Sequence, residues 1–140
     1  MAEYVIDATD LLVGRLATQA ARAALHGKNV KVINCEKAVF SGKKTMIIEN
    51  WKRKYGMGVP KKGPFIHRFP DKFVRRVIRG MLPYKQPRGR DAFERIMCYI
   101  GNPDDAKGET IEGANAEKLP NTRYVRVGVI CKELGGKWHE

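Results

Sequence analysis

The chain has 140 residues, 43% of them hydrophobic and 9% aromatic, which excludes a wholly disordered basic tail and fits a single domain over residues 1–140. Residues 43–95 hold 16 Lys or Arg against 4 Asp or Glu, a net charge of +12, whereas the remainder has 11 of each and is neutral. A charge confined to one segment is typical of a polyanion-binding protein, because each cation placed on a phosphate releases condensed counterions.

The cysteine pattern and the apolar runs narrow the class of protein further. Cys35, Cys98 and Cys131 form no Cys-x-x-Cys pair, which predicts buried thiols in a reducing cytosol. The histidines lack the spacing of a zinc site, so neither a metal ion nor another cofactor is expected. No apolar run approaches the roughly 20 residues that cross a bilayer, and Glu3 is unlike the start of a signal peptide, so no membrane partner is expected.

The N-terminal part has the pattern of a strand, a helix and a second strand. Residues 4–8 predict a short strand, after which Thr9 and Asp10 offer N-cap oxygens. Apolar residues then recur every three or four positions, which predicts an amphipathic helix that ends at Gly27. Residues 30–35 predict the second strand. Because the links are short, we expect a right-handed βαβ unit with parallel strands.

Residues 41–69 predict a helix followed by an extended loop. The helix opens at Ser41–Lys44, and its expected buried stripe comprises Ile47, Ile48, Trp51 and Tyr55. Residues 56–69 are rich in Gly, Pro and Lys, so we expect a loop that contributes little to the core.

A strongly amphipathic helix is predicted next, with Asp71 as its cap and Pro83 beyond its end. Its basic face carries Lys72, Arg75, Arg76 and Arg79. Its apolar face carries Phe73, Val74, Val77, Ile78 and Met81. One face therefore suits a core, and the other suits phosphates.

The remaining elements are shorter. Residues 84–90 predict a second basic loop, and residues 91–95 predict a short helix. Residues 96–100 fit a buried strand, although an extension of the helix is also compatible with their pattern. Residues 102–122 predict a polar surface segment, and residues 124–130 predict the last strand.

The basic surface favours a nucleic acid over an ordinary solvated surface, because the stretch from Lys72 to Lys85 contains no Asp or Glu and would repel itself without a partner. Aromatic side chains among the cations suit either base stacking or core packing, namely Tyr55, Phe65, His67, Phe69 and Tyr84. For Trp51 and Tyr55, inward packing is favoured. The predicted RNA-binding residues are Lys43, Lys44, Lys52, Arg53, Lys54, Lys61, Lys62, Arg68, Lys72, Arg75, Arg76, Arg79, Lys85, Arg88 and Arg90.

Signals of catalysis are weak. The sequence contains no Gly-x-Gly-x-x-Gly, P-loop, His-Glu-x-x-His or Gly-x-Ser-x-Gly motif. Asp7 follows a strand, where α/β enzymes often place an acid, so the alternative function is a nucleic-acid-processing enzyme with Asp7 as acid or base and the basic segment as a substrate clamp. Helix capping and the helix dipole explain Asp7 and Asp10 adequately, and this reading is favoured. The missing glycine-rich loop disfavours a small-molecule phosphate binder.

Several segments together resemble the universal large-subunit ribosomal protein family numbered thirteen. The most specific is Val77–Pro83, and the others are Val5–Ala8, Val13–Ala17, Val32–Asn34, Ser41–Lys44, Arg88–Arg90 and Tyr99–Gly101. They occur in order over nearly the whole chain. Asn102-Pro103-Asp104 replaces the His-Pro-His run of bacterial members, so the chain is more similar to the archaeal and eukaryotic branch, and its short length favours the archaeal form.

The resemblance implies a fold, a partner and the absence of catalysis. The fold is α/β, with three α/β/α layers around a small, about four-stranded, mostly parallel sheet from which basic helices and loops project. The function is that of a structural, non-enzymatic constituent of the cytoplasmic large ribosomal subunit, which binds large-subunit ribosomal RNA, supports subunit assembly and touches neighbouring ribosomal proteins, with no small-molecule substrate. The Gly42–Lys44 turn and Arg79–Pro83 would be contact regions.

Overall fold

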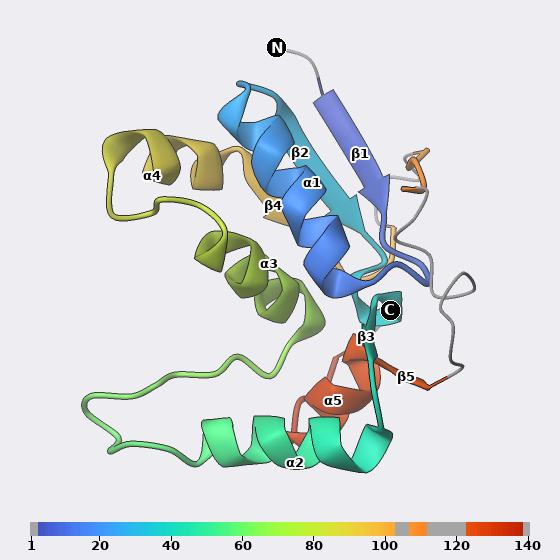
Figure 1. Ribbon diagram of the computed structural model, residues 1–140, viewed down its shortest axis with the longest axis vertical. Helices are drawn as coiled ribbons and strands as arrows, with labels where there is room; N and C mark the ends of the chain where they lie inside the picture. The colour runs from blue at the N-terminus through green and yellow to red at the C-terminus, as the bar shows by residue number, and fades with distance from the viewer. Residues whose placement is uncertain (1–2, 103–106, 112–122, 139–140) are drawn as a thin grey trace.

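The computed structural model describes residues 3–102, 107–111 and 123–138 and confirms the α/β class (Figure 1). Three parallel strands form the main sheet in the order β1 (Glu3–Asp7), β2 (Asn29–Ile33) and β4 (Ile96–Cys98). Helix α1 (Val13–Leu25) connects the first two strands, so the predicted βαβ unit is confirmed. Residues 96–98 form a strand, as the apolar pattern favoured.

Helix α1 lies close to the sheet because its buried face is built mainly from alanines at positions 17, 20, 21 and 24. It ends where predicted, since Gly27 adopts a φ of +92° just beyond the last turn. Its start differs from the expected one. Leu12 occupies the N-cap position without a side-chain hydrogen bond, and Asp10, which was expected as a cap, forms an ion pair with Arg126 instead.

The helices cover one face of the sheet. The aligned residues Ile6, Val32 and Cys98 are buried, whereas on the opposite face Lys31 is half-buried and Met97 is 47% exposed. The strands follow one another across the sheet in the order β1, β2, β4. The connections from β1 to β2 and from β2 to β4 therefore run in the same direction, and right-handed crossovers place the helices of both on the same face of the sheet. The described residues therefore form two layers around three strands, where the resemblance implied three layers around about four.

Helix α3 (Pro70–Gly80) supplies the second part of the core through Phe73, Val74 and Ile78, each of which contributes about 1.5–3 kcal/mol by burial. Two details differ from the prediction. The helix begins at Pro70, so Asp71 lies in its first turn and is not its cap, and Met81 is 43% exposed.

Helix α4 (Pro87–Glu94) begins earlier than expected, so residues 87–90 of the predicted second basic loop are helical. Gly89 explains how the chain turns here. A Cβ at this position would lie 1.9 Å from the carbonyl oxygen of Pro83, so the preceding turn closes against α4 only without a side chain.

A smaller unit lies beside the main sheet. It contains the short helix η1 (Cys35–Lys37), strand β3 (Val39–Ser41), strand β5 (Tyr124–Arg126) and helix α5 (Val127–Glu133), with β3 and β5 antiparallel. The sequence did not predict η1 or β3, and the strand predicted over 124–130 is wrong beyond Arg126. All three cysteines are buried, as predicted.

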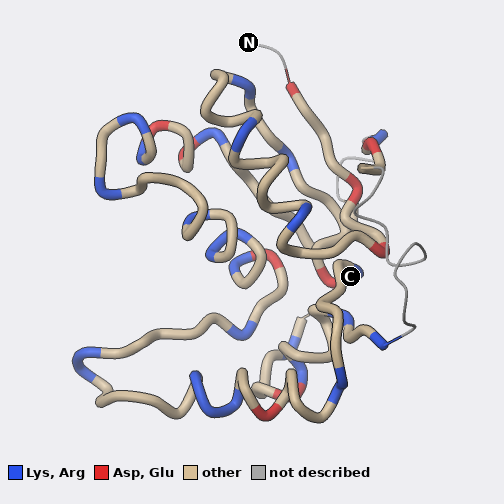
Figure 2. The backbone as a smooth tube through the Cα atoms, in the orientation of Figure 1, with Lys and Arg blue, Asp and Glu red and all other residues tan. Residues whose placement is uncertain are grey.

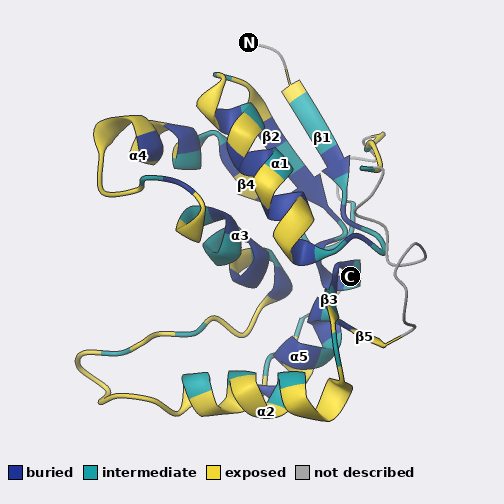
Figure 3. Cartoon of the chain, viewed as in Figure 1, coloured by how far each residue is buried: buried dark blue, intermediate teal, exposed yellow. Residues whose placement is uncertain are grey.

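Helix α2 (Lys44–Tyr55) and the loop of residues 56–69 extend away from the sheet (Figure 1). The expected buried stripe of α2 is wrong in degree, since no residue of this helix is fully buried (Figure 3). Ile47 and Trp51 pack against the core, whereas Tyr55 is 39% exposed.

Most of the segment 102–122 lies outside the described residues. Within those that are described, no helix is long and apolar enough to cross a membrane.

Candidate nucleic-acid interface

The predicted RNA-binding cations lie on α2, the loop of residues 56–69, α3 and the start of α4, on the side of the molecule away from β1 (Figure 2). In the described part of the chain, one of the fifteen pairs with a carboxylate, since Lys52 Nζ lies 3.5 Å from Glu133 Oε2. Both side chains are about half exposed, so water screens this pair and it contributes little to stability. The positive charge of the set is thus almost entirely uncompensated by acids of the described residues.

The densest group of cations surrounds a depression of about 250 Å³, which we call the cationic pocket. Helix α3 forms one wall, the loop of residues 56–69 contributes His67, and α4 contributes Phe93. No acid is among its lining residues, which are His67, Lys72, Arg75, Arg76, Arg79 and Phe93. Such a cluster attracts an anion, because its members repel one another in the free protein.

Neighbouring groups hold two of these guanidinium groups in place. Arg76 Nη1 donates a hydrogen bond to the carbonyl oxygen of Phe65, which links α3 to the loop of residues 56–69. The guanidinium of Arg79 lies 4.5 Å from the centre of the Tyr84 ring. Side chains that are already ordered lose less conformational entropy when a phosphate binds.

Arg75, which the sequence predicted as an RNA-binding residue, also has partners within the protein. Its Nε donates to the carbonyl oxygen of Ile96 at 3.0 Å, and its Nη2 donates to that of Phe93 at 3.1 Å. The guanidinium also stacks on the Phe93 ring at 3.9 Å, and burial lowers the pKa of Arg75. Two of its three side-chain nitrogens therefore hold α3 against β4 and α4.

The loop of residues 56–69 carries exposed aromatic and basic side chains. Phe65 is 61% exposed and Phe69 41% exposed, while Arg68 lies 5.8 Å from the centre of the Tyr55 ring. The sequence expected Tyr55 to pack inward, which is wrong. It also expected Trp51 to do so, and this is confirmed by a ring contact with Phe73 at 4.5 Å.

The other predicted cations surround these groups. Lys43 and Lys44 are exposed at the start of α2, and Lys61 and Lys62 are exposed in the loop. Lys54 covers Trp51 at 4.5 Å, and Arg53 donates to Asn50 at 3.1 Å. At the start of α4, Arg88 donates to Gln86 at 3.2 Å, and Lys85 and Arg90 are exposed nearby.

Comparison with known proteins decides the family. The model of the family described as ribosomal protein L13 matches residues 1–105. The chain belongs to the ribosomal protein L13 family. It is 46% identical over 136 residues to the large ribosomal subunit protein uL13 of Methanopyrus kandleri, covering 94% of this chain and 86% of that protein. It is 41% identical over 134 residues to the protein of the same name from Haloarcula marismortui, covering 96% of this chain and 92% of that protein.

These relatives confirm the resemblance found in the sequence and its archaeal type. The L13 family is a family of structural proteins and not of enzymes, so the alternative function based on Asp7 is wrong. Asp7 Oδ1 accepts hydrogen bonds from the backbone and hydroxyl of Thr9 and from the amide of Asn34. Burial alone would raise the pKa of Asp7, but these bonds and the charge of Lys37 lower it overall. The carboxylate therefore organises the end of β1.

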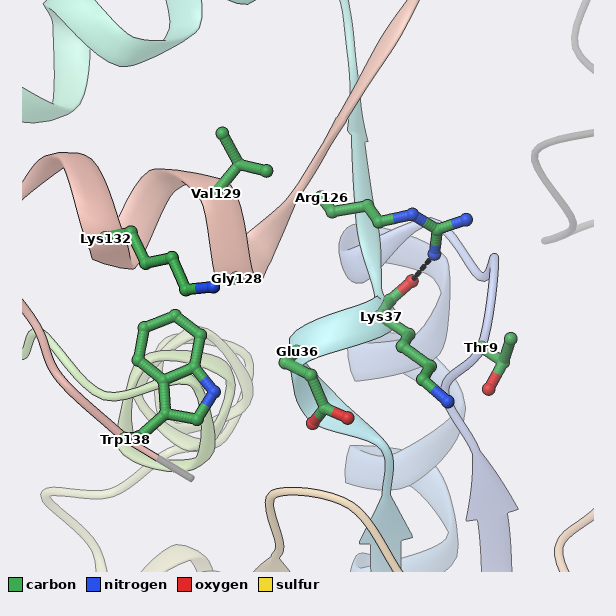
Figure 4. Close-up of a pocket in the computed structure, with 8 residues that line it drawn as sticks. All are labelled: Thr9, Glu36, Lys37, Arg126, Gly128, Val129, Lys132 and Trp138. Carbon is green, nitrogen blue, oxygen red and sulfur yellow. Dashed lines mark hydrogen bonds between the residues drawn. The ribbon is translucent and has the colours of Figure 1, made fainter. Parts of the chain in front are cut away.

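A second pocket of this L13-family chain, of about 330 Å³, lies between α5 and η1 (Figure 4). Its cations were not predicted to bind RNA, and they have partners within the protein. Arg126 donates to the carbonyl oxygen of Lys37 at 3.0 Å and pairs with Asp10 at 2.7 Å, while Lys132 lies 5.3 Å from the centre of the Trp138 ring. The buried carboxylate of Glu36 also lines it, which disfavours an anion. Its lining therefore suits an anion less well than that of the cationic pocket, which has no acid.

Proposed function

We propose that this L13-family chain is a structural component of the cytoplasmic large ribosomal subunit, where it binds large-subunit ribosomal RNA, supports subunit assembly and touches neighbouring ribosomal proteins. The observation that carries the RNA-binding part is the uncompensated basic surface of residues 43–95. Its cations lie on neighbouring elements, and one of the fifteen is paired with an acid in the described part of the chain. The names of the relatives support the assignment to the large subunit.

Most contacts are expected to involve phosphate and sugar, which give affinity and position, while the shape of the RNA gives specificity. All fifteen predicted cations form the proposed surface, but Arg75 contributes mainly by positioning α3, because two of its nitrogens already donate to carbonyl oxygens. The exposed rings of Phe65 and Phe69 are available to stack on unpaired bases.

The salt dependence of RNA binding tests this surface. We expect that replacing Lys72, Arg76 and Arg79 by Ala weakens binding to large-subunit ribosomal RNA in a filter assay. Each lost phosphate contact removes about 0.7–0.9 from the slope of log affinity against log salt. A matched variant with Arg22, Lys28 and Lys132 replaced by Ala removes the same charge from exposed positions outside the segment and should keep the slope. An equal loss of slope in both variants would contradict the proposal.

Co-sedimentation tests the assignment to the subunit. A structural component stays with purified large subunits as salt rises, whereas a transient electrostatic partner dissociates, because the many contacts of a built-in protein include apolar and protein–protein ones that salt does not weaken. Loss of the protein from the subunit at moderate salt would contradict a structural role.

A further inference from the structure

The cationic pocket adjoins a further depression, of about 260 Å³, which is distinct from the pocket between α5 and η1. We call it the apolar pocket. The apolar pocket lies between α2 and α3 and is lined by Trp51, Lys54, Ile66, His67, Phe73, Arg76 and Val77. His67 and Arg76 line both pockets. The two pockets thus place a cluster of cations beside an apolar depression, and His67 and Arg76 belong to both.

The charges around His67 are strongly one-sided. Lys72, Arg75, Arg76 and Arg79 approach from α3, Lys54 approaches from α2, and Arg68 follows it in the loop. Among the described residues, Asp71 in the first turn of α3 is the acid that acts on it. Burial, and then the charges of Arg76, Lys72 and Arg79, lower the pKa of His67, and Asp71 only partly opposes them. Burial and the surrounding cations therefore disfavour the protonated imidazole in the free protein, and a bound anion would offset the charge of those cations.

We propose that the cationic pocket binds one phosphodiester group of RNA and that His67 takes up a proton from solvent when this group binds. The inference deepens the RNA-binding function proposed above and rests on it. His67 was not among the predicted RNA-binding cations, because a histidine in a loop gives no sequence signal of its charge.

The geometry favours a nucleotide over free phosphate. A phosphate in the cationic pocket lies beside the loop of residues 56–69, whose Phe65 and Phe69 rings are exposed, and a nucleotide carries an aromatic base attached to its phosphate through the sugar. Base stacking on an aromatic side chain adds affinity that inorganic phosphate lacks. Protonated imidazole donates hydrogen bonds from both nitrogens, so uptake of a proton gives the phosphate one more charged donor.

The sign of the pH dependence follows from linkage. The phosphodiester brings a negative charge next to His67 and raises its pKa in the complex above that in the free protein. The protonated form is then favoured by binding, so affinity rises as pH falls from the pKa of the complex to that of the free protein. Each unit of difference between the two pKa values corresponds to about a tenfold change in Kd.

The test measures Kd for an oligonucleotide of large-subunit ribosomal RNA at constant ionic strength between about pH 8 and about pH 5.5, where an ordinary histidine titrates. We expect Kd of the full chain to fall by about tenfold over this range. His67→Gln should abolish most of this change while leaving the salt slope nearly intact. His26→Gln, at an exposed position after α1, should behave like the unchanged protein.

NMR titration of the His67 ring distinguishes the sources of phosphate. The pKa of His67 should rise when the RNA oligonucleotide is added and much less with inorganic phosphate at the same phosphate concentration. An equal rise with inorganic phosphate would overturn the assignment to a nucleotide.

In the Kd measurements, RNA binding without pH dependence, or with a dependence that survives in His67→Gln, would overturn the inference and leave the proposed function standing. Failure to bind this RNA at any pH would count against the proposed function itself.

Discussion

Asp7 illustrates how a residue that resembles a catalytic acid can be fully used by the fold. Its Oδ1 accepts hydrogen bonds of 3.0 Å from Thr9 N, 2.7 Å from Thr9 Oγ1 and 3.0 Å from Asn34 Nδ2. Asn34 has a left-handed backbone, with a φ of 57°, which asparagine tolerates better than most residues. The carboxylate therefore ties the end of β1 to the turn that follows β2.

This arrangement predicts a specific pH dependence of stability. The pKa of Asp7 is lower in the folded protein than its ordinary value of 3.8, so its contribution to stability is present above that value and is lost as pH falls through the folded-state pKa. We expect Asp7→Asn to be less stable near neutral pH and to show a shallower loss of unfolding free energy in acid, as measured by urea denaturation. Glu3→Gln removes an exposed carboxylate from the same strand and serves as the control. A steep acid dependence that is unchanged in Asp7→Asn would contradict this role.

At the same scale, the sequence identified which residues are basic but not what each one contacts. Arg75 and Arg95 count toward the charge of residues 43–95, yet Arg95 Nη1 donates to the carbonyl oxygen of Ala24 at 2.9 Å and Arg75 donates to those of Phe93 and Ile96. These acceptors lie up to 71 positions away along the chain. Helical periodicity places an arginine on a face of its helix, but it does not show whether water or a carbonyl oxygen lies opposite.

Among the elements, the contact between α3 and β4 depends on Arg75. We expect Arg75→Ala to lower the unfolding free energy by about 1–3 kcal/mol, because the carbonyl oxygens of the half-buried Phe93 and the buried Ile96 lose a charged donor. Urea denaturation followed by circular dichroism measures this loss. Lys72→Ala, on the exposed side of the same helix, should change stability by less than about 0.5 kcal/mol. Equal stability of the two variants would show that Arg75 does not hold α3 in place.

The elements that sequence patterns predicted well are those with long periodicity and local partners. Helix α1 and helix α3 and the parallel pair β1–β2 belong to this group. The patterns failed for residues 127–133, where Val127, Val129 and Ile130 favour a strand but the chain is helical. Val127 N donates to Ala38 O at 2.8 Å, and Gly128 packs closely against Glu36 and Trp138. Distant tertiary contacts therefore override the local β preference, and the same holds for the three-residue strand β3, whose partner is β5.

For the whole molecule, the like charges of residues 43–95 repel one another in the RNA-free protein, because a net charge of +12 lies on neighbouring elements. Ions in solution screen exposed charges over a Debye length of about 10 Å at 0.1 M salt. Repulsion among like charges falls when salt is added, whereas a fold held by surface ion pairs weakens. The direction of the salt effect therefore distinguishes a surface built to meet a polyanion from one balanced within the chain.

We therefore expect the melting temperature of the RNA-free protein to rise with sodium chloride, as measured by differential scanning calorimetry. Replacing the exposed residues Lys61, Lys62 and Lys85 by Gln should stabilise the protein at low salt by on the order of 1 kcal/mol in total, which raises the melting temperature by about 4 °C. The same variant should gain less from added salt. Replacing Arg22, Lys28 and Lys132 by Gln removes three charges from the neutral remainder of the chain and should give no such stabilisation. A melting temperature that falls with salt, or equal effects of the two triple variants, would contradict this expectation. It would mean that acids of the same chain compensate the cations of residues 43–95, so that these cations are not free to bind RNA.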